Sequence, residues 1–118
     1  MYKNRFFSTG FVCLKYNILF FGSDEFSLIC LKELVKNNHL INNLQVISAQ
    51  NSVSSLPKFT HLENIPTFRA PYKTLKGWDI PSENYDFGVV VSFGYFLPKR
   101  ILKRFQGTLN VHPSLLPK

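Results

Sequence analysis

The chain has 118 residues, 45% hydrophobic and 15% aromatic, which is enough for one domain with a modest core and too short for a second. Its net charge of +7 predicts attraction to anions without separating RNA, DNA and an acidic cofactor. No window of about 20 apolar residues suggests a membrane span. Cys13 and Cys30 have no CxxC spacing, so we expect reduced thiols, with Cys30 in a helix core, and no metal site. His39 and His61 lie in polar stretches and are expected to be exposed.

The N-terminal lead, residues 1–15, is basic and aromatic, and no acidic residue occurs before Asp24. This composition is typical of a mitochondrial presequence. We therefore expect a targeting segment at residues 1–15 and a folded domain at residues 16–118. A ragged N-terminus ahead of the first strand is the alternative, and it would leave a cytoplasmic location open.

A continuous apolar run from Asn17 to Gly22 predicts a strand buried on both faces of a parallel sheet. Ser23 and Asp24 then offer N-cap oxygens for a helix that is expected to end near Asn37. A single glycine at this turn is too few for a dinucleotide-binding phosphate loop. The residues expected to form the apolar stripe of the helix are Phe26, Ile29, Cys30, Leu31, Leu34 and Val35.

The middle of the chain is less strongly patterned. Residues 44–49 predict a second strand, which a polar loop follows. Residues 58–64 suggest a short helix with Phe59 and Leu62 facing inward. Residues 65–68 contain a proline, which is tolerated in an edge strand, so we expect one there.

Residues 86–92 carry the strongest strand signal, because they are β-branched and bounded by polar residues and glycine. We expect this strand to lie parallel to residues 17–22 in one sheet. Residues 93–98 would then form a loop at its carboxyl end, where α/β proteins bind ligands. The alternative is an aromatic loop that only closes the core. Residues 99–105 predict one to two helical turns whose four basic side chains are expected to be solvated.

The last dozen residues hold the strongest candidate for chemistry. If Thr108 to His112 is a strand, alternation sends Asn110 and His112 to the same face at the strand's carboxyl end. Pro113 ends ladder pairing, so the following residues must leave the sheet as a loop. An amide that binds a carbonyl oxygen and an imidazole that moves a proton suit acyl transfer. The alternative is a buried polar pair that ends a strand.

The segment from Leu109 to Lys118 resembles the signature segment of the 10-formyltetrahydrofolate-dependent formyltransferases. The resemblance implies a Rossmann-like α/β fold, with a mostly parallel sheet of about five strands and flanking helices. It also implies that Asn110 and His112 are catalytic. In that family a catalytic Asp follows further along the chain, so we expect residues 16–118 to be an incomplete formyltransferase N-terminal domain that is inactive alone.

The resemblance also implies two sets of binding residues. The residues that would hold 10-formyltetrahydrofolate are Ser92, Gly94, Tyr95, Phe96, Leu97, Ser114, Leu115, Leu116 and Pro117. The residues that resemble the substrate loop of methionyl-tRNA formyltransferases are Gly22, Ser23, Asp24, Glu25 and Phe26. The resemblance implies no metal.

The implied function is transfer of a formyl group from 10-formyltetrahydrofolate to initiator methionyl-tRNA, by a monomer in the mitochondrial matrix that has no membrane partner. One alternative is another folate-dependent formyltransferase or hydrolase, because such enzymes share a similar signature segment. Another alternative is an inactive fragment that at most binds folate or RNA.

Overall fold

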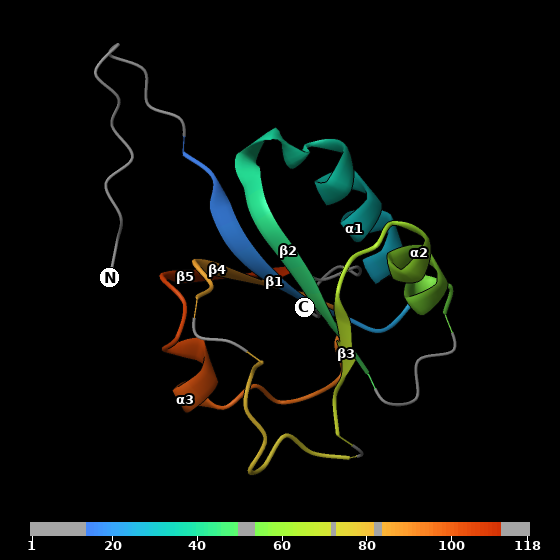
Figure 1. Cartoon of the computed structure of the whole chain (residues 1–118). Helices are drawn as coiled ribbons and strands as arrows, with labels where there is room; N and C mark the ends of the chain where they lie inside the picture. The colour runs from blue at the N-terminus through green and yellow to red at the C-terminus, as the bar shows by residue number, and fades with distance from the viewer. Residues whose placement is uncertain (1–13, 50–53, 72, 82–83, 112–118) are drawn as a thin grey trace, which may run out of the picture.

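The computed structural model describes residues 14–49, 54–71, 73–81 and 84–111 (Figure 1). The presequence-like residues 1–13 and the segment from His112 to Lys118 lie outside this part of the chain. The elements in chain order are β1 (Tyr16–Gly22), α1 (Glu25–Lys36), η1 (Asn38–Leu40), β2 (Ile41–Ser48), α2 (Leu56–Leu62), β3 (Thr67–Arg69), β4 (Phe87–Val91), α3 (Lys99–Leu102) and β5 (Gly107–Val111).

The five strands form one parallel sheet in the order β3-β2-β1-β4-β5. β1 pairs with β4 in register from Ile18 opposite Phe87 to Gly22 opposite Val91, which confirms the predicted parallel pairing. β3 lies at the edge of the sheet, as its proline-containing approach predicted. The chain order reverses between β1 and β4, and a Rossmann-like α/β fold binds ligands outside the carboxyl ends of the strands at such a point.

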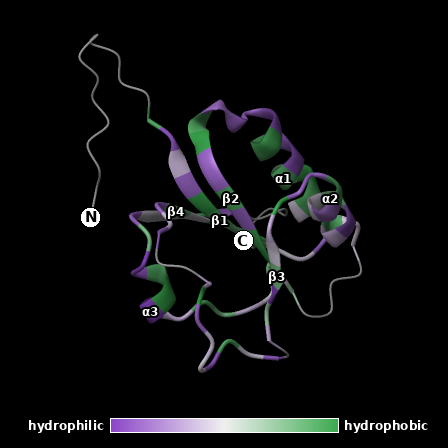
Figure 2. Cartoon of the chain, in the orientation of Figure 1, coloured by the Kyte–Doolittle hydropathy of each residue, from purple (hydrophilic) through white to green (hydrophobic). Residues whose placement is uncertain are grey.

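Two clusters of apolar side chains cover the two faces of the sheet, because successive residues of a strand point in opposite directions. In β1, Phe20 packs with α1 and α2, whereas Leu19 and Phe21 pack on the face that carries α3. Figure 1 shows α1 and α2 on one side of the sheet and α3 on the other. In Figure 2, β1 changes from hydrophilic at its start to hydrophobic toward its carboxyl end. The apolar end of β1, which is covered on both faces, is therefore the end that lies at the carboxyl edge of the sheet.

The inward face of α1 differs from the predicted stripe. Leu28 and Leu31 are buried, whereas Ile29 is 60% exposed and Cys30 is only half-buried. The predicted stripe was wrong at Ile29 and omitted Leu28, whereas its other members pack in or against the core. Periodicity gives the spacing of an apolar face but not which arc of the helix faces the strands. Burial, together with the nearby Asp24 carboxylate, raises the pKa of the Cys30 thiol, so this thiol is held in its neutral form.

The short helix α2 corrects a second prediction. Leu56 and Thr60 are its buried residues, Phe59 is half-buried, and Leu62 is 67% exposed. The expected inward position of Leu62 was wrong, because the helix starts two residues earlier than predicted and buries Leu56 and Thr60 instead, with Leu62 as its last residue. Both histidines that the structure describes, His39 and His61, are exposed as predicted.

Candidate active site

The candidate site lies where β1 and β4 end side by side. Gly22 is in register with Val91, and the loops that follow them are joined because the Ser23 hydroxyl donates a hydrogen bond to the Ser92 carbonyl oxygen. This bond links the predicted substrate loop to the predicted folate loop. The two loops are therefore held together at the switch point of the sheet.

The turn from β1 into α1 is packed tightly. A Cβ atom on Gly22 would lie 2.8 Å from the Phe20 ring and from the Ser27 side chain, so this position requires glycine. Asp24 caps α1 by accepting from the Ser27 backbone N–H at 2.9 Å, and the Asp24 N–H donates to the Ser27 hydroxyl at 3.0 Å. This capping box fixes the first turn of α1.

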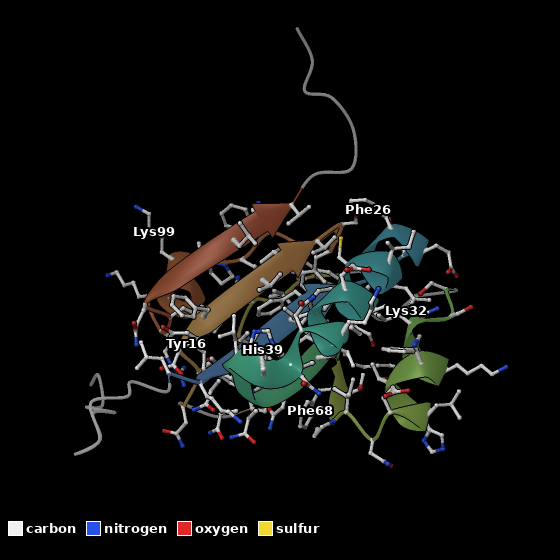
Figure 3. The ribbon with its side chains drawn as sticks, turned by 90° about the horizontal axis from the view of Figure 1, so that it is seen from above. Tyr16, Phe26, Lys32, His39, Phe68 and Lys99 are labelled. Atoms are coloured by element: carbon white, nitrogen blue, oxygen red, sulfur yellow. The ribbon has the colours of Figure 1, made fainter. Side chains whose placement is uncertain are left out.

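The residues of the predicted substrate loop differ in exposure and in hydrogen bonding. Asp24 and Glu25 are exposed, and Phe26 is half-buried. Figure 3 shows Phe26 beside the carboxyl end of β4. The Glu25 carboxylate accepts a hydrogen bond from the Ser55 backbone N–H at 2.8 Å, so it is occupied in holding the start of α2. Phe26 thus packs against the core under α1, while Asp24 and Glu25 stabilise the start of α1 and of α2.

Backbone strain marks the loop after β4. Ser92 has a φ of 48°, which is uncommon for a residue with a side chain, and Gly94 has a φ of 84°. The Ser92 hydroxyl oxygen is buried without a hydrogen-bond partner, and such an unpaired group costs about 1 to 3 kcal/mol. Strained and unsatisfied groups collect at binding sites, where a ligand can complete them. The Ser92 hydroxyl is therefore a candidate ligand contact.

The aromatic loop splits into a packed part and an exposed part. Phe93 is buried, and the centroid of its ring lies 5.2 Å from that of Phe21 and 4.7 Å from that of Tyr95. Tyr95 also donates a hydrogen bond to the carbonyl oxygen of Pro71 at 3.0 Å. Phe96 is 86% exposed. Packing in the core therefore accounts for the position of the Phe93 ring and in part for that of Tyr95. It does not account for the exposed ring of Phe96.

A cavity of about 330 Å³ lies beside this loop. Its lining residues are Lys73, Thr74, Leu75, Lys76, Gly77, Gly94, Tyr95, Phe96, Pro98 and Arg100. The sequence analysis missed Lys73 and Lys76 of this cavity, because the segment at residues 73–77 has no periodicity that would connect it to the aromatic loop.

The basic face of α3 is not merely solvated, which corrects another prediction. The Arg100 guanidinium donates to the carbonyl oxygens of Leu75 at 3.1 Å and Trp78 at 2.5 Å. Arg104 donates to both carboxylate oxygens of Asp79, at 2.8 and 2.9 Å. The pKa of Asp79 is lowered, first by the hydrogen bond from the backbone N–H of Ile80 and then by Arg104. Two of the four basic residues therefore tie α3 to the segment that lines the cavity.

Asn110 is an exposed residue of β5, opposite Val90 of β4. The next residue, Val111, packs with the cluster under α1 and α2, so alternation directs Asn110 to the face that carries α3 and the aromatic loop. His112 and the loop from Ser114 to Pro117 lie outside the described residues. Their expected place beside Asn110 stays a prediction.

The described part of the chain contains no group of three His, Cys, Asp or Glu side chains that could hold a metal ion. None of its helices is long and apolar enough to cross a membrane. The groups that the site does present are an amide, an unpaired hydroxyl and an open glycine backbone. These groups can bind a polar, flat ligand and donate a hydrogen bond to an oxygen of it.

This parallel sheet, with loops converging at its switch point, defines a Rossmann-like α/β domain, a fold in which ligands bind outside the carboxyl ends of the strands. The family model described as formyl transferase matches residues 16–118. The chain belongs to the formyl transferase family.

The similar proteins include enzymes of mitochondria and of bacteria. The chain is 35% identical over 112 residues to the mitochondrial methionyl-tRNA formyltransferase of Homo sapiens, a match that covers 87% of this chain and 27% of the relative. It is 37% identical over 116 residues to the methionyl-tRNA formyltransferase of Prochlorococcus marinus, covering 86% and 33%. The chain thus spans about a third of the length of these relatives.

Proposed function

We propose that this chain is the N-terminal part of an enzyme that transfers a formyl group from 10-formyltetrahydrofolate to initiator methionyl-tRNA. The observation that carries the proposal is the position of Asn110, exposed at the carboxyl half of β5 on the face of the sheet that holds the loop after β4. Family membership supports formyl transfer. The names of the relatives support the tRNA substrate.

The proposed reaction is attack of the methionyl amine on the formyl carbon of the donor. The carbonyl oxygen gains negative charge as the tetrahedral intermediate forms, and the Asn110 amide would donate a hydrogen bond to it. His112 would take the proton that the attacking amine loses, because imidazole titrates near neutral pH. The carbon–nitrogen bond to the folate then breaks, and tetrahydrofolate leaves with a proton. The family's catalytic Asp, which would follow Lys118, would orient the imidazole.

The formyl donor would lie along the loop after β4. Gly94 has open space where a side chain would be, so a flat ring can approach its backbone closely. The buried hydroxyl of Ser92 would find its hydrogen-bond partner in the donor or in a water held with it. The segment from Ser114 to Pro117 would hold the donor from the other side.

The test is formyl transfer to charged initiator tRNA by a chimera that joins residues 16–118 to the remaining two thirds of the Prochlorococcus marinus relative. Asn110→Ala should lose about 2.7 to 4 kcal/mol of transition-state stabilisation, and His112→Ala about 10²- to 10⁴-fold in rate. The matched control is His61→Ala, because His61 is exposed on α2. Near-normal rates in the Asn110 or His112 variants would show that this segment is structural.

The same assay separates the enzyme from an inactive fragment. We expect residues 1–118 alone to transfer formyl groups poorly, since they span only about a third of the relatives and lack the family's catalytic Asp. The chimera should restore transfer. A chimera that folds, binds tRNA and still fails to transfer would favour the fragment, with at most folate or RNA binding.

A mitochondrial location is the second part of the proposal. The composition of residues 1–15 supports it, and the similar proteins include both mitochondrial and bacterial enzymes at comparable identity. A fluorescent protein fused to residues 1–15 should enter mitochondria, and Arg5→Glu should abolish entry because import of such leads depends on positive charge. A diffuse cytosolic signal from the unchanged fusion would support the cytoplasmic alternative.

A further inference from the structure

The strand β5 is an unprotected edge of the sheet. Among the residues that the structure describes, β5 pairs with β4 and no strand pairs with its outer side. Natural sheets protect such edges by shortening them, by bulges, or by charged residues and proline. β3, the opposite edge, has only three residues and ends at Arg69. β5 has five residues, none of them charged or proline, and pairs with β4 without a bulge, so a further strand can pair there.

The outward-facing backbone groups of β5 belong to particular residues. The Gln106 N–H donates to the Asp86 carbonyl oxygen at 2.8 Å, so the backbone of Gln106 is directed toward β4. Successive residues of a strand direct their N–H and carbonyl groups to opposite sides, so every second residue of β5 faces away from β4. The outward-facing residues are Gly107, Leu109 and Val111. Their spacing of two is the spacing at which a partner strand forms its hydrogen bonds.

The face of β4 and β5 beside α1 is apolar and only partly covered. Leu109 is 60% exposed, and it lines a surface cavity of about 410 Å³ together with Phe87 and Val89. Val89 is in register with Leu109, so the two side chains lie on the same face. Figure 3, in which β4 is orange and β5 red, shows both strands to one side of α1. A partner at this edge can therefore cover the Leu109 side chain while it pairs with the backbone.

We propose that the 118-residue chain forms a two-fold dimer in which β5 pairs antiparallel with β5 of a second copy. A two-fold axis at Leu109 sets this residue opposite Leu109 of the partner subunit and pairs all three outward-facing residues. Asn110 then lies opposite Thr108 of the partner subunit, so the strand that carries the candidate catalytic amide is part of the interface. The occupant is a second copy because each copy supplies the strand that the other lacks.

The proposal concerns this chain, whereas the monomer expected from the resemblance is the longer enzyme, and it does not rest on formyl transfer. Two chains of net charge +7 repel each other, so added salt should strengthen the dimer. β5 itself adds no charge, and Arg104 before it is paired with Asp79. A contact between two five-residue strands lies at or below the roughly 1,200 Å² of transient interfaces. We therefore expect a dissociation constant on the order of 10 to 100 μM.

The test is sedimentation velocity of the 118-residue chain, whose monomer mass is 13.7 kDa. The concentrations should run from about 5 to 500 μM, on both sides of the expected dissociation constant. Leu109→Lys sets like charges opposite each other and should weaken the dimer at least about tenfold. Leu62→Lys is the matched control, because Leu62 is 67% exposed at the end of α2, and it should change the dissociation constant by no more than about twofold. Circular dichroism checks that each variant is folded.

Disulfide formation tests the register, in a chain that also carries Cys13→Ser and Cys30→Ser. Directly opposite residues of antiparallel strands have Cα atoms about 4.5 to 5.5 Å apart, which a disulfide can span. Leu109→Cys should therefore form a covalent dimer on mild oxidation. Thr108→Cys should not, because the residue opposite it is Asn110 of the partner subunit.

Four results would overturn the proposal. A monomer at every concentration would mean that the β5 edge does not associate. Equal weakening by Leu109→Lys and Leu62→Lys would show that β5 is not the interface. Cross-linking through Thr108→Cys as efficient as that through Leu109→Cys would contradict the two-fold register. Assemblies that keep growing with concentration would contradict a closed dimer.

Discussion

Removing the Arg100 guanidinium should loosen the segment that lines the cavity, because this one side chain bridges α3 to two backbone carbonyl groups. Its Nη2 atom donates to the oxygens of Leu75 at 3.1 Å and Trp78 at 2.5 Å, and its Nη1 atom lies 3.9 Å from Asp79. Hydrogen bonds from a charged group contribute about 1.5 to 3 kcal/mol each. The Arg100 side chain is 46% exposed, so water can replace part of what Arg100→Ala removes.

We therefore expect Arg100→Ala to lower the free energy of unfolding by about 1.5 to 3 kcal/mol, less than the two bonds would contribute if fully buried. For a domain of this size about 1 kcal/mol corresponds to roughly 4 °C in Tm, so the melting temperature should fall by about 6 to 12 °C. Arg100→Lys keeps the charge but loses the planar fork that reaches both carbonyls, and it should recover at most about half of the loss.

Thermal unfolding followed by circular dichroism measures the global change, and fluorescence of Trp78, the only tryptophan of the chain, reports the loop itself. Lys99→Ala is the matched control, because Lys99 is the exposed neighbour of Arg100 on α3. An Arg100→Ala protein that melts within about 2 °C of the Lys99→Ala protein would refute the reasoning, since it would mean that water satisfies both carbonyl groups equally well.

Two further outcomes follow from the packing and the charges. Gly22→Ala should destabilise the domain by about 1 to 3 kcal/mol in urea unfolding, because the new methyl group would overlap its neighbours. Gly107→Ala is the control and should cost less, because its methyl group would meet only ordinary contacts at 3.5 Å. Equal losses in the two variants would contradict the steric argument. Asp79 has a pKa below its ordinary value of 3.8, so its contribution to stability is present above that value and is lost as the pH falls through the lowered pKa. Because the Asp79 side chain is 54% exposed, its contribution to stability should be about 0.5 kcal/mol or less. When the free energy of unfolding is measured against pH, Asp79→Asn should therefore reduce the loss of stability at acidic pH. An unchanged loss would show that the ion pair adds nothing to stability.

Local pattern predicted the strands and their parallel direction, although β2 begins at Ile41, three residues before its predicted start at residue 44. The runs that became β1 and β4 are continuous and apolar, and a strand of that kind is stable only when both of its faces are covered, which requires a parallel sheet with crossover helices. An N-cap at Ser23 or Asp24 was also predicted from residue type, and Asp24 is the cap, because a capping side chain acts on the N–H groups of its own helix. Asn110 could be placed on a strand in the same way, since alternation is a property of the strand itself.

Only the tertiary structure decided which faces of those elements are buried and which side chains they contact. Ile29 and Leu62 are apolar and lie on helices, yet both are exposed, because a helix buries only the arc that faces its neighbour. Helical periodicity does not predict the angle at which a helix packs on the sheet. The bonds from Arg100 to backbone atoms more than twenty positions earlier depend on how a non-periodic loop folds back over α3. The burial of the unpaired Ser92 hydroxyl likewise depends on distant segments, since the Ser92 backbone is bonded to the Ser23 side chain of the neighbouring loop. Contacts between distant segments depend on the packing of the whole chain, which no local pattern records.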